Sequence, residues 1–88
     1  MASYITLGQK VEIAQEHRTE ADLDYVCTAF AVQVSPGNIV LIDSTSFNRL
    51  YDVNIARALK EKNGQLVLCV EEIEKLLSED FWHIYKIK

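Results

Sequence analysis

The chain has 88 residues, of which 49% are hydrophobic and 25% are charged, and its formal net charge is −4. This apolar content exceeds that of disordered chains, and the length suits one domain, so we expect a single compact domain over residues 1–88. Proteins that bind duplex nucleic acid are usually basic, so the charge argues against that class. The sequence has no 18-residue apolar span and no secretory leader pattern. We therefore expect a cytoplasmic protein that does not enter a membrane.

The first third of the sequence predicts two short strands and a polar loop. Residues 3–7 and 10–15 are rich in strand-forming side chains, and Gly8 and Gln9 separate them, so we predict a hairpin here. Residues 16–24 are polar and acidic, which is typical of a loop.

A second hairpin follows at residues 25–34 and 39–43. The first segment places alternating side chains on one face, and the second is almost continuously apolar. Pro36 and Gly37 between them are typical of a type II turn, because proline presets φ and glycine adopts a positive φ. The alternating face consists of Val26, Thr28, Phe30, Val32 and Val34.

The middle of the chain predicts a long helix after three hydroxyl residues. Ser44, Thr45 and Ser46 are preferred N-cap types, and residues 47–62 place apolar side chains on one side of a helical wheel. Asn63 and Gly64 would end this helix. A phosphate-binding loop at this position would need glycines and a lysine, which are missing, so we interpret the hydroxyl residues as a helix cap.

The last third predicts a buried strand at 65–70, a short helix at 71–80 and a final strand at 81–88. A long helix between the strands at 39–43 and 65–70 has the length of a parallel crossover. The expected order is therefore β-β-β-β-α-β-α-β. We predict an α+β fold with a mixed, mostly antiparallel sheet of about five to six strands and two helices on one face.

No pattern of catalytic or metal-binding residues rises above chance. Cys69, His83 and Asp43 could form a nucleophile, base and orienting acid, but no local signature supports such a site. The histidines and cysteines lack the short paired spacing of zinc ligands, and the acidic residues at 20–24 lack the glycine of a calcium loop. We predict no enzyme activity, no cofactor and no metal. The two cysteines, Cys27 and Cys69, are expected to be reduced and buried.

Charge is distributed unevenly along the chain, and this pattern supplies the candidate contact residues. One acidic run contains Glu16, Glu20, Asp22 and Asp24, and a second contains Glu71, Glu72, Glu74, Glu79 and Asp80. The predicted long helix has an outward basic side with Arg49, Arg57 and Lys60. The final strand adds Trp82 beside two lysines.

Segregated charge on a small domain favours a protein–protein interaction domain that binds, and inhibits or regulates, a larger protein. The acidic runs would face a basic surface of that partner. Assembly into a homo-oligomer is compatible with this function, because a chain of this length buries a small core. The first alternative is binding of single-stranded nucleic acid by the aromatic and basic final strand. The second alternative is a small cysteine-dependent enzyme.

Overall fold

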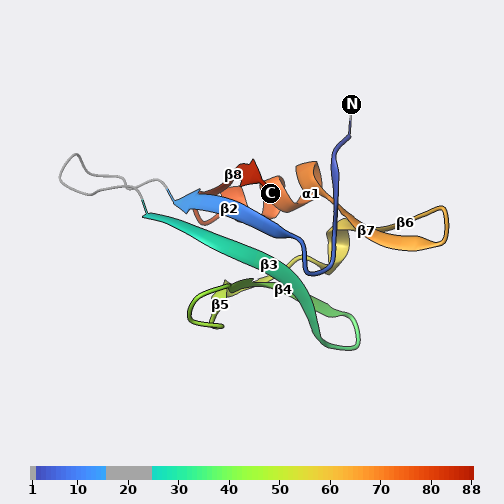
Figure 1. The fold of residues 1–88 in the computed structure, drawn as a ribbon, viewed down its shortest axis with the longest axis horizontal. Coiled ribbons are helices and arrows are strands. Elements are labelled where there is room, and N and C mark those ends of the chain that lie inside the picture. Colours follow the sequence, from blue (N-terminus) through green and yellow to red (C-terminus); the bar gives the residue numbers. More distant parts are fainter. Residues whose placement is uncertain (1, 16–24) are drawn as a thin grey trace.

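The computed structural model describes residues 2–15 and 25–88, and these residues form two antiparallel sheets and one α-helix (Figure 1). The four acidic residues predicted in the first run (16–24) lie outside the described residues. The larger sheet has the strand order β5 (Arg49–Asn54), β4 (Asn38–Asp43), β3 (Tyr25–Ser35), β2 (Lys10–Gln15) and β8 (Trp82–Ile87). The smaller sheet has the order β1 (Tyr4–Thr6), β7 (Gln65–Cys69) and β6 (Leu59–Lys62).

The first predicted hairpin is wrong, although both of its strands are present. β1 pairs with β7, placing Tyr4 opposite Cys69, whereas β2 pairs with β3 and β8. The turn between β1 and β2 sends the two strands into different sheets. It is held by Gly8, which has a φ of 86°, and by the side chain of Gln9, whose Oε1 accepts the Thr6 N–H at 3.0 Å. A positive φ and a side-chain acceptor make this a change of direction rather than a hairpin turn.

The second predicted hairpin is confirmed. β3 pairs antiparallel with β4 from Ala29↔Asp43 to Ser35↔Asn38, with an irregularity near the turn. Gly37 adopts a φ of 77°, as the turn type requires.

The long helix predicted over residues 47–62 is wrong. In its place are β5, the 3-10 helix η1 (Ala56–Ala58) and β6. Phe47 has a φ of 61°, in the left-handed region that a helix cannot contain, and residues 52–54 include three poor helix formers. Leu50 and Val53 instead pack against the core from an extended chain. The parallel crossover fails with the helix, because β4 and β7 belong to different sheets and every described strand pair is antiparallel.

The short helix and the final strand are confirmed. α1 (Val70–Ser78) begins directly after β7, and Ile73 and Leu77 on its inward side are buried. The coarse α+β class therefore holds, but among the described residues there is one α-helix rather than two.

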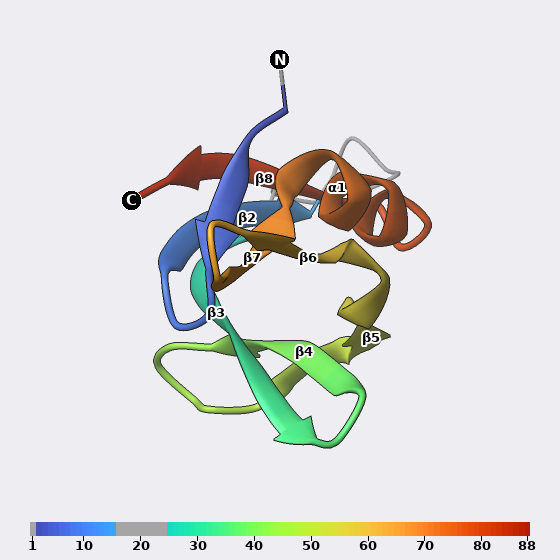
Figure 2. The ribbon, with the colours of Figure 1, turned by 90° about the vertical axis from the view of Figure 1, so that its right-hand side faces the viewer.

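The five-stranded sheet curves around the rest of the molecule, so it has an inner and an outer face (Figure 2). α1, η1 and the smaller sheet fill the inner side, while β3 and α1 lie on opposite sides of the molecule in this view. The largest fully buried side chains include Ile5, Ile13, Leu41, Ile55, Leu68, Ile73, Leu77 and Trp82. The inward side chains of β3 are small, since Ala29 and Ala31 occupy the buried positions.

Candidate functional site

The outer face of the five-stranded sheet carries an apolar patch. The alternating residues of β3 that the sequence singled out point outward, because the intervening Ala29 and Ala31 face the core. Phe47, in the loop between β4 and β5, joins them: its ring meets that of Phe30 edge-to-face, with centroids 6.5 Å apart. Phe47 is 70% exposed and Val26 52% exposed. We define the outer patch as Val26, Phe30, Val32, Val34 and Phe47.

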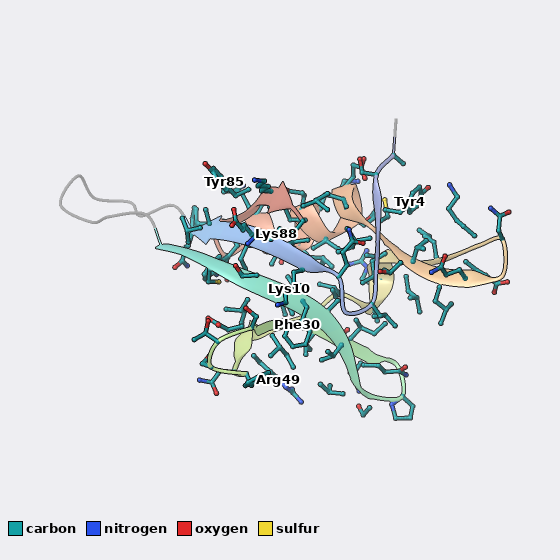
Figure 3. All side chains as sticks on the ribbon, in the orientation of Figure 1. Tyr4, Lys10, Phe30, Arg49, Tyr85 and Lys88 are labelled. Atoms are coloured by element: carbon teal, nitrogen blue, oxygen red, sulfur yellow. The ribbon has the colours of Figure 1, made fainter. Side chains whose placement is uncertain are left out.

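Basic residues border the outer patch. The strand registers place Lys10 opposite Phe30, Phe30 opposite Ile42, and Ile42 opposite Arg49, so these four side chains share the outer face. Lys10, Phe30 and Arg49 follow one another across the sheet in Figure 3, with Lys88 beside Lys10. Further along, Glu12 lies opposite Lys86, and its carboxylate pairs with the Lys88 ammonium at 3.1 Å. Among the side chains that the structure describes, the border therefore has four cations and one carboxylate, although the chain as a whole is acidic.

The predicted acidic residues of α1 have mixed roles. Glu71 accepts the Ser3 N–H at 2.9 Å, and this bond lowers the pKa of its carboxyl. Glu74 accepts the Ile84 N–H of β8 at 2.8 Å, and Glu72 pairs with Lys75. Neutralising Glu71 or Glu74 would therefore disturb the fold as well as the surface. The exposed Glu79 and Asp80 complete the run just after the helix, where the Asp80 backbone oxygen accepts the Gln15 side-chain amide at 3.2 Å.

The structure does not bring the three predicted basic residues into one stripe. Arg49 begins β5 on the outer face, whereas Lys60 lies on β6 in the smaller sheet. Arg57 lies in η1, where it lines a shallow depression of about 220 Å³ together with Glu72 of α1 and Glu79, which follows that helix. The predicted stripe depended on helical spacing, and the chain is extended or 3-10 helical there.

Trp82 is unsuitable as a surface contact because its side chain is only 2% exposed. The sequence predicted it as a contact residue beside the lysines of the final strand, but it belongs to the core cluster with Ile13 and Leu77. The exposed aromatic of β8 is Tyr85, at 70% exposure. A register shift between Glu12 and Ile13 of β2 leaves Tyr85 without an opposite residue in the pairing.

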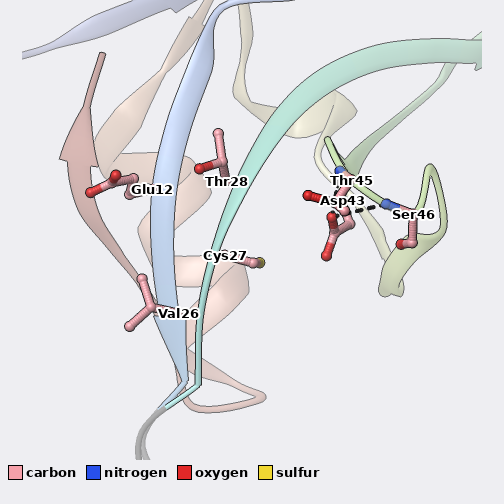
Figure 4. Close-up of a pocket in the computed structure, with 7 residues that line it drawn as sticks. All are labelled: Glu12, Val26, Cys27, Thr28, Asp43, Thr45 and Ser46. Atoms are coloured by element: carbon pink, nitrogen blue, oxygen red, sulfur yellow. Dashed lines mark hydrogen bonds between the residues drawn. The ribbon is translucent and has the colours of Figure 1, made fainter.

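An open pocket of about 550 Å³ adjoins the outer patch where β3 begins and β4 ends (Figure 4). Two of the three predicted hydroxyl cap residues, Thr45 and Ser46, are found here, but β5 rather than a helix follows them. The Asp43 Oδ1 instead accepts the N–H groups of Thr45 at 2.7 Å and Ser46 at 3.3 Å, which closes a tight turn. Asp43 itself is only 8% exposed. The pocket is lined by Glu12, Val26, Cys27, Thr28, Asp43, Thr45 and Ser46.

Cys27 points toward the Asp43 turn and is half-buried (Figure 4). Burial, and secondarily the negative charge of Asp43, raise the pKa of this thiol from 9.0 to about 11. A protonated thiol is a poor nucleophile, so Cys27 contributes a weak hydrogen-bond donor to the pocket.

The residues of the hypothetical cysteine site have different neighbours. The buried Cys69 thiol contacts Glu71 at 3.4 Å, and His83 lies 4.0 Å from Glu74. The Oδ1 atom of Asp43 accepts two backbone N–H groups of its own turn. Both cysteines are free thiols. Within residues 2–15 and 25–88 there is no group of three or more histidine, cysteine or acidic side chains that could hold a metal ion.

The outer patch was visible in the sequence, but its role was not. The alternation in β3 showed which side chains share a face. The signal that could have identified this face as the outer one is the small size of the residues on the opposite face of the strand, which are Cys27, Ala29 and Ala31.

Comparison with protein-family models, with curated proteins and with solved structures found no match to this chain. In the part of the chain that the structure describes, no helix has the length and apolar character needed to cross a bilayer.

Proposed function

We propose that this protein is a small protein-binding domain that uses the outer patch and its basic border to cover a surface of a larger partner. The observation that carries the proposal is one sheet face on which three apolar side chains are exposed, Val26, Val34 and Phe47, and two more are half-buried. Large apolar side chains gathered on one exposed face are typical of interaction surfaces. Aromatic residues such as Phe30 and Phe47 are enriched at the centres of such interfaces.

The charges around the patch indicate the chemistry of the partner. Lys10, Arg49 and Lys86 would attract acidic side chains at the edge of the partner's surface, while the centre of that surface would be apolar. This is the reverse of the polarity expected from the acidic run of α1, because that helix lies on the inner side of the sheet and the cations border the outer patch.

The test compares variants that remove one feature of the surface at a time. Proteins captured by the wild-type chain from an extract of its source cells would be purified, and their dissociation constants measured by calorimetry. Phe47→Ser should weaken binding about tenfold or more, because truncating a central aromatic typically costs more than 1 kcal/mol. Arg49→Glu should weaken binding and reduce its dependence on salt.

Each variant has a matched control in the smaller sheet. Leu66→Ser changes a side chain that is 49% exposed on β7, and Lys60→Glu reverses an exposed charge on β6. Neither should change binding. Equal effects of Phe47→Ser and Leu66→Ser would contradict the proposal. Light scattering would also be measured for the wild type and for Phe47→Ser. A dimeric wild type and a monomeric Phe47→Ser would mean that the partner is a second copy of this chain.

The single-stranded nucleic-acid alternative has less support, because Trp82, its main stacking residue, is buried. Tyr85 remains exposed beside Lys86. Titration with a labelled oligonucleotide checks this alternative, and tight binding that is lost in Tyr85→Ala would favour it.

A further inference from the structure

The pocket beside the outer patch has a chemistry that differs from the basic border. Two of its residues, Val26 of the outer patch and Thr28, are outward side chains of β3, so the pocket is continuous with the proposed contact surface. Its polar groups are mainly acceptors: the carboxylates of Asp43 and Glu12 and the hydroxyls of Thr28, Thr45 and Ser46.

Asp43 is the most buried of the polar residues that line this pocket. Its side chain is more than nine-tenths buried, and its Oδ1 is occupied by the two N–H groups of its own turn. The described residues supply no hydrogen-bond donor to Oδ2. Glu12 is already paired with Lys88, so the Asp43 carboxylate is the unpaired negative charge of the pocket.

A partner that covers Val26 and Thr28 also covers the mouth of the pocket. It would remove water from the Asp43 carboxylate, and a buried carboxylate without a cation is strongly unfavourable. Such a partner must therefore bring a positive group to this position or bind poorly.

We propose that the pocket receives the cationic side chain of a lysine or arginine from the bound partner, with Asp43 as its counter-ion. This inference rests on the proposed function, because the partner that supplies the cation is the one that covers the outer patch. Cys27 stays protonated and Glu12 is paired with Lys88, so Asp43 is the anion available to the cation. The hydroxyls of Thr28 and Thr45 accept the remaining N–H donors of the cation. The pocket would then select partners, since an acidic and apolar surface without this one cation would be rejected.

The pocket can be tested on the isolated chain with small probes. Ethylguanidinium and its neutral isostere ethylurea would be titrated separately while the amide signals of Thr28, Thr45 and Ser46 are followed by NMR. We expect saturable shifts with ethylguanidinium, and shifts at least fivefold weaker with ethylurea. Asp43→Asn keeps an oxygen acceptor for the turn but removes the charge, and it should reduce ethylguanidinium binding by at least fivefold.

Two further variants separate this inference from the proposed function and from misfolding. Thr45→Lys leaves Asp43 intact but supplies a cation from the chain itself, so it should block ethylguanidinium. Phe47→Ser should bind ethylguanidinium as the wild type does, even though it loses the partner. Normal binding in Asp43→Asn or in Thr45→Lys would overturn the pocket assignment and leave the outer patch unaffected. Spermidine binding more than tenfold tighter than ethylguanidinium would overturn the assignment to a side chain and indicate a free polyamine.

Discussion

The two faces of the five-stranded sheet are both apolar, yet only one of them is the core. On the inner face, Ile13 of β2 and Leu41 of β4 are fully buried against α1 and the smaller sheet. On the outer face, Val34 is 38% exposed and Phe47 is 70% exposed. The comparison teaches that alternation in a strand identifies two faces without saying which is buried. Which face is buried depends on the neighbouring strands, where large side chains such as Ile13 and Leu41 point into the core.

The largest expected effect is on the inner face. Ile13→Ala should lower the free energy of unfolding by about 3 kcal/mol, because it leaves a cavity in a packed core. Val34→Ala, on the outer face, should cost about 0.5 kcal/mol or less. Urea denaturation of both variants measures the difference, and similar losses in the two variants would contradict the distinction between the faces.

The next effect is at the end of the inner face, where Asp43 closes the turn. Asp43→Ala removes the acceptor of two backbone N–H groups and should lower the free energy of unfolding by about 1–2 kcal/mol. Asp43→Asn should cost less than half as much, since the amide oxygen can accept the same bonds. Equal losses in the two variants would mean that the charge of Asp43, rather than its turn bonds, provides the stability. The free energies of unfolding of both variants would then be compared in high salt.

The smallest effect concerns Cys27, which lies on the inner side of β3 but reaches the pocket. Its pKa is raised to about 11, so between pH 9 and 11 the unfolded chain releases a proton that the native chain retains. Stability should therefore be unaffected by this thiol below pH 9 and fall as the pH rises through that window. We expect a loss of about 1 kcal/mol, less than the ~2.7 kcal/mol equivalent of two pH units, because the thiol is partly exposed to solvent.

Urea denaturation of the wild type and Cys27→Ala at pH 8 and pH 10.5 isolates this contribution. The wild type should lose more stability between the two values than the variant does. Identical pH dependence in the two chains would show that the Cys27 thiol titrates normally and is not affected by its surroundings.

The sequence was sufficient for β1 to β4, β7, β8 and α1, because those segments carry strong local patterns, but it predicted a helix where β5 and β6 lie. The turn at Pro36 and Gly37 specifies its hairpin without help from the rest of the chain, and the inward residues Ile73 and Leu77 specify the buried side of α1. The pairing of β1 with β7 could not be predicted in this way, because it joins residues more than sixty positions apart and depends on the whole fold.

The region after Asp43 shows how a local pattern misleads. Its apolar residues fit a helical wheel, and its hydroxyl residues fit a helix cap. The Asp43 carboxylate captures the N–H groups of Thr45 and Ser46 instead, and Phe47 then takes a left-handed conformation. An aspartate side chain can bind backbone N–H groups that a helix would otherwise use, and in this protein the turn forms instead of the helix. The candidate site depends on this turn. The expected helix would have placed Arg57 and Lys60 on the same side as Arg49, whereas they lie on η1 and β6.

The bond between Glu74 and the Ile84 N–H has a consequence for self-assembly. β8 is the outermost strand of its sheet, and the free edge of such a strand can pair with a strand from another molecule and start a growing fibre. The helix places a carboxylate on one of the backbone donors of this strand, so an incoming chain would have to displace that side chain before pairing there. Glu74 therefore lowers the number of free backbone donors on β8 that a strand from another molecule could bind.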